Sequence, residues 1–240
     1  MIYALIVKGG IIMATYTQVK SFIDTIYPLV QKEAMKRKKA GKPWVLPSVC
    51  IAQAALETGW GTSSMMTKAN AYFGIKAGLT WKGKVYRSST KECYDGVNLV
   101  TIKDSFRAYD SLQESIEDYY RLICDVPRYR KAVNCTSARN TITEIKKAGY
   151  ATAPTYIESV MSVITCNNLT QYDEILKSYV LGNYRTKKKL RIRRGAGLTS
   201  KAIGAVPSGK KIKITQIQNK IWGYSSYYSG WICLKHCEKI

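Results

Sequence analysis

The sequence predicts an α+β protein, with a mainly helical body that carries one β-hairpin and a small β-barrel after it. Three observations predict this fold class. Apolar residues recur at helical spacing up to about residue 173, a strand-like segment interrupts the helices once, and the chain from residue 187 on consists of short alternating runs between turn residues. A chain of 240 residues has room for one ordinary domain and a small second one.

Five helices are expected in the body. The first places apolar residues such as Phe22 and Ile26 on one helix face and ends near Gly41. The second begins at Pro47, because proline is favoured in a first turn, and ends at Gly59. The other three are expected within residues 111–125, 136–149 and 154–169.

Residues 84–109 have strand-like sequence, and Asp95-Gly96 within them is a strong signal for a two-residue hairpin turn. After the helices, short alternating runs such as Lys211–Thr215 lie between closely spaced turn residues, a pattern typical of a small β-barrel. We therefore divide the chain into an N-terminal extension, the helical body, a linker and a β domain. Their expected bounds are residues 1–13, 14–173, 174–186 and 187–240.

The N-terminal extension is apolar, but it is shorter than the roughly 20 residues that a membrane-spanning helix needs. It has neither a basic leading segment nor a small-residue cleavage site, so we expect neither a signal peptide nor membrane insertion. Met13 opens a segment that reads like a natural start. We expect the protein to stay in the cytoplasm until lysis, or another route of secretion, releases it.

The charge of the chain is strongly positive. Its 38 Lys and Arg stand against 16 Asp and Glu, which gives a net charge of +22. Such a surface concentrates polyanions, and nucleic acid and a phosphate-rich bacterial wall are both candidates. The basic run at residues 185–194 is more typical of a linker entering a strand than of a nucleic-acid site. We therefore expect wall polymers, including teichoic acids, as partners, and no nucleic acid.

The cysteines do not form a recognisable framework. There are seven, an odd number, and no two of them form a CxxC pair. The single His236 lies between Cys233 and Cys237, but this cluster has no second half that could complete a zinc site. We therefore expect no metal and no cofactor, and we expect the thiols to be mostly reduced.

Glu57 is an acid at the end of an otherwise apolar helix, one turn after Gln53. Its carboxyl is expected at the edge of a buried face, where partial desolvation and the negative end of the helix dipole both favour the protonated form. A protonated carboxyl can donate its proton to a leaving oxygen. Gly59 and Gly61 allow a sharp turn, with Trp60 as a wall against a sugar ring. The alternative is that Glu57 only occupies a helix end.

The sequence around Glu57 belongs to a longer pattern. The stretch "LPSVCIAQAALETGWGTS" is followed by "NAYFGIKAG" and then, in order, by "STKECYDG", "FRAYDSLQESIEDY" and "AGYATAPTYIESVMSVI". These five motifs resemble the glucosaminidase family of bacterial wall hydrolases, glycoside hydrolase family 73, and the resemblance covers roughly residues 16–173. The resemblance implies a lysozyme-like fold. It also implies an endo-β-N-acetylglucosaminidase that hydrolyses the β-1,4 bond after N-acetylglucosamine in peptidoglycan.

By this resemblance Glu57 is the general acid, and Glu92 in the hairpin motif is the best candidate for a second carboxylate. An exposed strand acid is the alternative for Glu92. Tyr150 is expected to hold the acetamido group or a developing charge, unless it only packs with a satisfied hydroxyl. Ala153 stands where the family usually has an aspartate, which argues against a charged role there. The expected substrate-binding residues are Trp60, Asn70, Tyr72 and Tyr156.

Two mechanisms remain open at this point. In the first, Glu92 acts as a base on water, which inverts the anomeric centre and requires carboxyl groups about 6.5–9.5 Å apart. In the second, the acetamido group of the substrate attacks, and no protein nucleophile is needed.

The C-terminal segment resembles the bacterial SH3-type wall-binding module, mainly through its spaced glycines and through "GW" at residues 230–231. The resemblance implies a small SH3-like barrel that tethers the enzyme to peptidoglycan and raises its effective concentration there. Trp222, Tyr224 and Trp231 are the expected wall-binding residues. For the two tryptophans, a place in the barrel core is the alternative.

Other functions are compatible with the same residues. A lytic transglycosylase or a muramidase-type enzyme on this fold would also use one glutamate, and a non-catalytic wall-binding protein would use none. The sequence fits both a phage endolysin and a host autolysin, and the missing export signal favours the phage protein.

Overall fold

The structure is a computed structural model that describes residues 2–7, 10–93, 99–176 and 179–240, with side chains for 14–88, 103–176 and 179–240. The chain divides into two compact units, Met1–Leu176 and Lys177–Ile240. Each unit has its own buried core. Among the described residues, no helix combines the length and apolar character that crossing a membrane requires.

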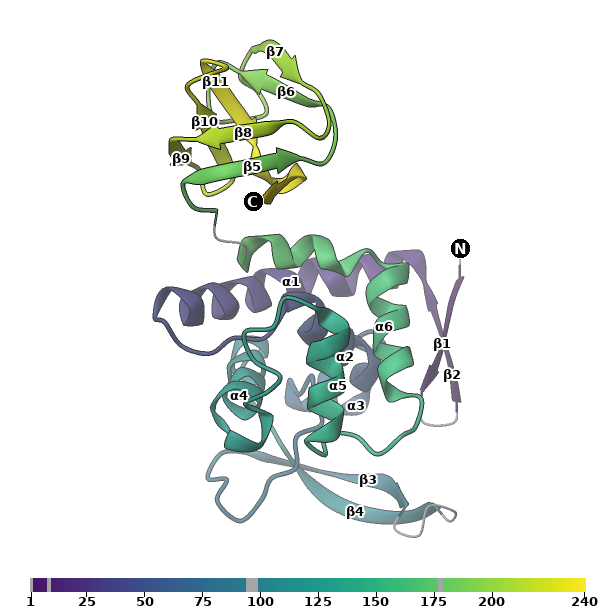
Figure 1. The fold of residues 1–240 in the computed structure, drawn as a ribbon. Helices are drawn as coiled ribbons and strands as arrows, with labels where there is room; N and C mark the ends of the chain where they lie inside the picture. The colour runs from purple at the N-terminus through teal and green to yellow at the C-terminus, as the bar shows by residue number, and fades with distance from the viewer. Residues whose placement is uncertain (1, 8–9, 94–98, 177–178) are drawn as a thin grey trace. The chain divides into compact units, whose positions relative to one another are not determined.

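The first unit consists of helices packed around one another, with two β-hairpins (Figure 1). The helices are α1 (Tyr16–Lys39), α2 (Pro47–Thr58), α3 (Ser64–Ala69), α4 (Leu112–Asp125), α5 (Ala138–Lys147) and α6 (Tyr156–Cys166), with 3-10 turns η1 (Pro127–Tyr129) and η2 (Leu169–Leu176). The hairpins are β1 (Ile2–Val7) with β2 (Gly10–Thr15) and β3 (Val85–Cys93) with β4 (Leu99–Arg107). All five predicted helices are present. The short helix α3 was not predicted.

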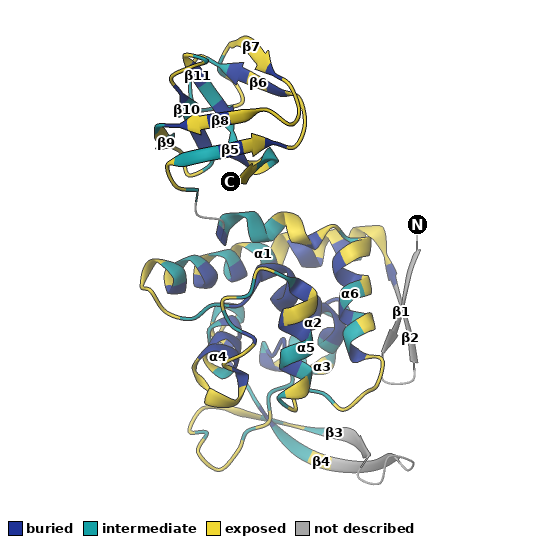
Figure 2. Ribbon diagram, in the orientation of Figure 1, coloured by how far each residue is buried: buried dark blue, intermediate teal, exposed yellow. Residues whose placement is uncertain are grey.

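Helix α2 is the centre of this unit. It contacts α1, α5, α6 and η2, and it is dark blue in Figure 2. Every residue from Pro47 to Thr58 is buried except Glu57. A helix that is mostly apolar on all sides is stable only when other elements cover it. The rest of the unit therefore packs around α2 and leaves only Glu57 half-buried.

The N-terminus of α2 is capped from a distant part of the chain. Leu46 at the cap position makes no side-chain hydrogen bond. Instead, the Ser48 amide and hydroxyl donate to the Asp173 carboxylate at 2.8 and 2.7 Å. A carboxylate at this end of a helix also interacts favourably with the helix dipole. The turn η2 thus belongs to the core structure of the first unit.

The predicted linker, residues 174–186, contains ordered elements of both units. Leu176 ends η2 and is buried in the first core. Gly182–Thr186 form the strand β5 of the second unit. Its side chains alternate as in a half-buried strand, since Tyr184 and Thr186 are buried and Arg185 between them is exposed. The predicted bounds of 173 and 187 therefore cut into both units.

Residues assigned to an N-terminal extension form most of a hairpin. β1 and β2 pair antiparallel from Ile2 opposite Thr15 to Val7 opposite Gly10. Two short apolar runs separated by Gly9-Gly10 are a hairpin signal that the sequence analysis did not use. Thr15 also caps α1, since its hydroxyl accepts from the Gln18 amide. The hairpin contacts α6 and α1.

The predicted hairpin of β3 and β4 is present, with described pairs from Val85–Arg107 to Cys93–Leu99. The predicted turn at Asp95-Gly96 lies outside the described residues. At the base of the hairpin, the Arg107 amide donates to the Ile75 carbonyl at 2.8 Å. Buried Asp118 of α4 accepts from the Arg107 guanidinium and the Tyr109 hydroxyl, both at 2.8 Å. These bonds fix the hairpin base against α4 and the loop that contains Ile75.

The second unit contains short strands, as predicted for the tail. One sheet has the order β7-β6-β11-β10-β9 and the other has the order β12-β5-β8. The strands are β5 (Gly182–Thr186), β6 (Leu190–Arg193), β7 (Ala202–Val206), β8 (Lys211–Ile214), β9 (Gln216–Gln218), β10 (Trp222–Ser225), β11 (Gly230–Cys233) and β12 (Cys237–Lys239). A Cβ atom on Gly230 would lie 2.4 Å from Ile192, so only glycine allows β11 to approach β6 this closely.

A buried arginine joins α1 to the end of α4. The Arg37 guanidinium donates to both carboxylate oxygens of Asp125, at 2.9 and 2.7 Å, and to Glu33 at 3.1 Å. This hydrogen bonding with Arg37 lowers the pKa of Asp125 below its ordinary value. The Asp125 side chain is half exposed, so solvent weakens the attraction.

A lowered pKa makes the contribution of Asp125 to stability depend on pH. The contribution is complete above the ordinary aspartate pKa of about 3.9 and is lost as the pH falls through the lowered pKa of the folded state. We expect Asp125→Asn to lower the free energy of unfolding by about 1 kcal/mol at pH 7. This difference should shrink below about pH 4. Urea unfolding followed by helical circular dichroism measures it.

Asp24→Asn is the matched control, because Asp24 forms an exposed ion pair with Lys20 on α1. It should change stability by less than about 0.5 kcal/mol at any pH. A loss in Asp125→Asn that stays constant from pH 7 to pH 3 would contradict this account of the Arg37 pair.

Candidate active site

Glu57 lies in the last turn of α2, half-buried at the edge of the first core. The helix ends there because Gly59 adopts the left-handed conformation, with φ of 56°. Trp60 and Gly61 follow with φ of 60° and 86°. Three successive left-handed residues reverse the chain directly after the acid.

Two tyrosines lie next to this carboxyl. Tyr150 follows α5 and Tyr156 begins α6, and their ring centroids are 6.2 Å apart. Burial raises the pKa of both hydroxyls, and the negative charge of Glu57 raises them further. Both tyrosines are therefore neutral hydrogen-bond donors at any physiological pH.

A buried hydrogen-bond chain holds Tyr156 in place. The Tyr119 hydroxyl donates to the Gln53 side-chain oxygen, and the Gln53 amide donates to the Tyr156 hydroxyl at 2.7 Å. Gln53 is completely buried one turn before Glu57 on α2. These hydrogen bonds connect α4, α2 and α6 one turn before the acid on α2. They use both hydrogen-bonding ends of Gln53, which a buried amide requires.

Tyr150 differs from Tyr156 in one respect. Its hydroxyl oxygen is buried, and it has no hydrogen-bond partner among the described residues. A buried hydroxyl without a partner costs free energy and is uncommon in folded proteins. The Tyr150 hydroxyl is therefore a hydrogen-bond donor that the described residues leave unused.

The other side of Glu57 is formed by the loop of the "NAYFGIK" motif. A Cβ atom placed on Gly74 would lie 3.9 Å from the Glu57 Oε2 atom and 3.5 Å from the end of Met65. Gly74 has a φ of 54°, a conformation that other residues adopt only with strain. The motif thus brings a backbone without a side chain close to the carboxyl.

Trp60 and Tyr72 do not lie where the sequence analysis expected them. Trp60 is only 3% exposed and packs edge-on against Phe22 of α1, with ring centroids 5.7 Å apart. The left-handed turn after α2 directs its ring back onto the core and away from solvent. Tyr72 is completely buried beside Phe22 and Phe73. In this structure neither ring offers a surface to a sugar.

Asn70 holds a loop, and Glu92 is described only through its backbone. Asn70 caps α3 in the left-handed conformation, and its amide donates to the Tyr109 carbonyl at 3.0 Å, so it holds the loop. The backbone of Glu92 lies in β3 opposite Val100 of β4. The Glu92 side chain lies outside the described residues.

In the second unit, Trp222 is buried, whereas Tyr224 and Trp231 are half-exposed. Tyr224 and Trp231 face each other across β10 and β11, with ring centroids 5.4 Å apart. Tyr227, which the sequence analysis did not single out, is 86% exposed and lies against Tyr228. Tyr224, Trp231 and Tyr227 therefore belong to the exposed aromatic surface of this unit, and Trp222 does not.

Metal ligands are not grouped in the described part of the chain, where no three His, Cys, Asp or Glu residues could hold an ion. The cysteines described there are all free. Cys50 and Cys124 are buried in the first core, and burial raises the pKa of Cys124 to about 12. These two thiols act as small apolar side chains.

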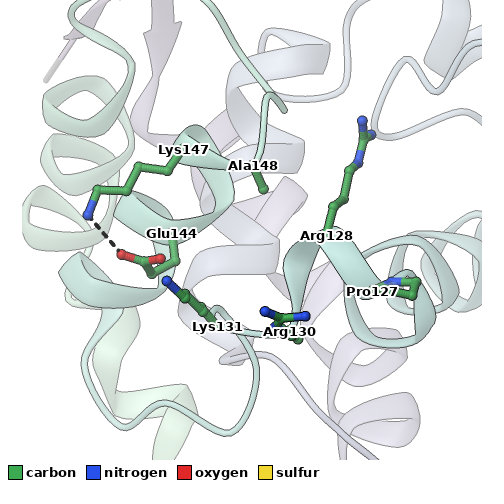
Figure 3. Close-up of a pocket in the computed structure, with 7 residues that line it drawn as sticks. All are labelled: Pro127, Arg128, Arg130, Lys131, Glu144, Lys147 and Ala148. Atoms are coloured by element: carbon green, nitrogen blue, oxygen red, sulfur yellow. Dashed lines mark hydrogen bonds and ion pairs between the residues drawn. The ribbon is translucent and has the colours of Figure 1, made fainter.

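A hollow that the sequence analysis did not predict lies between η1 and the end of α5 (Figure 3). Its volume is about 420 Å³, and none of the predicted site residues lines it. Its lining residues are Pro127, Arg128, Arg130, Lys131, Glu144, Lys147 and Ala148.

The chain is similar to known proteins over its first unit. The family model of glucosaminidases, described as mannosyl-glycoprotein endo-beta-N-acetylglucosaminidase, matches residues 33–169, more than half of the chain. The peptidoglycan hydrolase FlgJ of Vibrio parahaemolyticus is 37% identical over 154 residues, which are 62% of this chain and 48% of FlgJ. The exo-glucosaminidase LytG of Bacillus subtilis is 33% identical over 136 residues, 55% of this chain and 47% of LytG. The chain spans about half the length of these relatives.

Solved structures resemble the same part of the chain. The catalytic domain of the autolysin Auto from Listeria monocytogenes has a TM-score of 0.57 and 32% identity. The match covers 67% of this chain and 90% of that domain. The helical unit with its hairpin is therefore a lysozyme-like glucosaminidase fold, as the sequence analysis predicted.

The two tyrosines should respond differently to loss of their hydroxyls. Tyr156→Phe leaves the buried Gln53 amide without its acceptor, so we expect the free energy of unfolding to fall by about 1–3 kcal/mol. Tyr150→Phe removes a hydroxyl that has no described partner, so we expect little change or a small gain. Urea unfolding of the two variants measures the difference. Equal losses in both would contradict the hydrogen-bond chain described above.

Proposed function

The chain belongs to the glucosaminidase family, and we propose that it is a peptidoglycan hydrolase with Glu57 as its general acid. The single observation that carries the proposal is that Glu57 is the one residue of α2 that is not buried; it is half-buried on a helix whose other residues are all buried. A half-buried carboxyl next to neutral donors suits proton transfer to a leaving sugar oxygen. The names of the relatives, peptidoglycan hydrolase and exo-glucosaminidase, support the same substrate.

The bond cleaved in this proposal is the β-1,4 bond after N-acetylglucosamine, in the endo mode. Glu57 protonates the leaving oxygen. The unpartnered Tyr150 hydroxyl donates to the acetamido group or to charge that develops in the transition state. Tyr156, held by Gln53, packs beside Tyr150 and supports its ring. Asn70 positions the loop through Tyr109, and Gly74 leaves the carboxyl accessible.

The second half of the reaction has two candidate routes. Glu92 activates water in one, and the acetamido group of the substrate attacks the anomeric carbon in the other. Tyr150 fits the second route, because a donor beside the acetamido group can orient it. Neither route calls for a metal ligand or a nucleophilic side chain.

We propose that the second unit is an SH3-type module that holds the enzyme at the wall. It carries 15 Lys and Arg against one acid, Glu238, so +14 of the net charge of +22 belongs to it. Exposed Arg185 of β5 lies directly opposite exposed Lys211 of β8. Like charges in this register repel each other, so a bound anionic polymer such as teichoic acid would stabilise the sheet. Tyr224 and Trp231 offer a half-exposed aromatic pair.

The catalytic proposal is tested with purified peptidoglycan. Glu57→Gln cannot donate a proton, so we expect turnover to fall by roughly 10³-fold while helical circular dichroism stays unchanged. Tyr150→Phe should lower turnover at unchanged stability. Asp24→Asn, an exposed acid on α1, should behave as the parent. Equal clearing of walls by Glu57→Gln and the parent would rule out the proposal.

The same assay identifies the bond and the route. Mass spectrometry of the products should show reducing N-acetylglucosamine ends. Anhydro-muramic ends would instead assign a lytic transglycosylase. A Glu92→Gln variant that loses turnover by orders of magnitude supports the water route, and one with near-parent turnover supports the acetamido route.

The tether is tested by cosedimentation with purified walls. The triple variant Arg185→Gln, Lys211→Gln, Lys213→Gln should lose roughly tenfold in retention, because it removes three cations from one sheet face. Lys32→Gln, Lys39→Gln, Lys82→Gln is the matched control from exposed positions of the first unit. Equal retention of both variants would contradict the proposed role of the sheet. Duplex DNA at matched ionic strength serves as the comparison polyanion.

A further inference from the structure

The hollow between η1 and α5 is lined by more cations than acids. Arg128, Arg130, Lys131 and Lys147 contribute positive charge, and Glu144 is the one acid in the lining. Lys147 lies 3.0 Å from Glu144 and pairs with it. In Figure 3, Lys147 and Glu144 come from α5 and the three other cations come from the opposite segment, with Lys131 near Glu144 and the Arg128 side chain pointing away from it.

Of the remaining cations, Arg128 is fixed by a neutral partner, and Arg130 and Lys131 are exposed. The Arg128 guanidinium stacks on the Tyr129 ring at 4.6 Å and donates to the Tyr129 hydroxyl at 2.7 Å, a neutral partner. No carboxylate among the described residues pairs with Arg128, Arg130 or Lys131. A concave site with an excess of cations attracts an anionic ligand. The volume of about 420 Å³ is within the usual range for small-molecule sites.

The hollow lies on two segments that lead to the site around Glu57. On one side, buried Tyr129 directly follows Arg128 in η1, and its charge would raise the pKa of Tyr150 and of Tyr156. On the other side, the lining ends at Ala148, two residues before Tyr150. A polymer bound at Glu57 therefore has the basic hollow close by on the same two segments.

We propose that this hollow is a subsite for the carboxylates of the peptide stems of peptidoglycan. The proposal rests on the proposed function, since it assumes that the glycan strand lies at Glu57. The stems are attached to alternate sugars of that strand and carry free carboxylates. A subsite next to the scissile bond would meet these groups at high effective concentration. Carboxylate and arginine or lysine form charge-assisted hydrogen bonds, which suits Arg130 and Lys131.

Binding and hydrolysis are measured separately, so that failure of the subsite and failure of the enzyme are distinguishable. The full chain is titrated with a soluble stem tetrapeptide by NMR or calorimetry. The variant Arg130→Gln, Lys131→Gln should bind it roughly five- to tenfold more weakly than the parent. The control Lys32→Gln, Lys39→Gln makes the same change in net charge on α1 and should bind as the parent.

Hydrolysis is then compared on glycan strands with stems and on strands whose stems were removed. We expect the parent to have the higher kcat/KM on the stem-bearing strands. Arg130→Gln, Lys131→Gln should lower the ratio of the two values roughly five- to tenfold, mainly through KM.

Absence of tetrapeptide binding by the parent, or an unchanged ratio in the variant, would overturn the subsite. Tighter binding of poly(glycerol phosphate) than of the tetrapeptide would also overturn it and would assign the hollow to wall phosphates. If the parent released no reducing ends from either strand, the proposed function would fail, while the titration would still decide whether the hollow binds carboxylates.

Discussion

Burial of α2 is the constraint on which the rest of the first unit depends. A helix that is covered on every side must satisfy its polar groups internally, and the few polar side chains on α2 do so. Ser48 bonds to Asp173, Gln53 bonds to Tyr119 and Tyr156, and Thr58 bonds to the Ala54 carbonyl. Glu57 has the one position on α2 that reaches the surface. The packing that stabilises the fold therefore also determines where the candidate acid lies.

The same packing explains the contrast between the two tyrosines near Glu57. Tyr156 is tied to α2 through Gln53, and its hydroxyl is part of the structure. Tyr150 lies at the end of α5 with its hydroxyl buried and without a described partner. A protein retains such a group at a cost in stability, and functional sites are where that cost is commonly found. This contrast favours Tyr150 over Tyr156 for direct contact with substrate.

Local sequence signals predicted the elements well and predicted the directions of individual side chains less well. Pro47 and Gly59 correctly bounded α2, and helical spacing placed Glu57 at the edge of its buried face. Trp60 was wrongly expected at the surface, because three successive left-handed residues turn its ring onto Phe22. Asp173 could not be recognised as a cap from sequence, because its partner Ser48 is 125 positions away. The basic hollow likewise forms only when η1 and α5 come together.

The most direct measurement of the central claim is a crystal structure of Glu57→Gln with a bound N-acetylglucosamine-containing oligosaccharide. The account predicts that a glycosidic oxygen lies within hydrogen-bond distance of the residue 57 side chain, with the Tyr150 hydroxyl directed at the neighbouring acetamido group. An oligosaccharide bound at another face of the first unit, with residue 57 open to solvent, would contradict it.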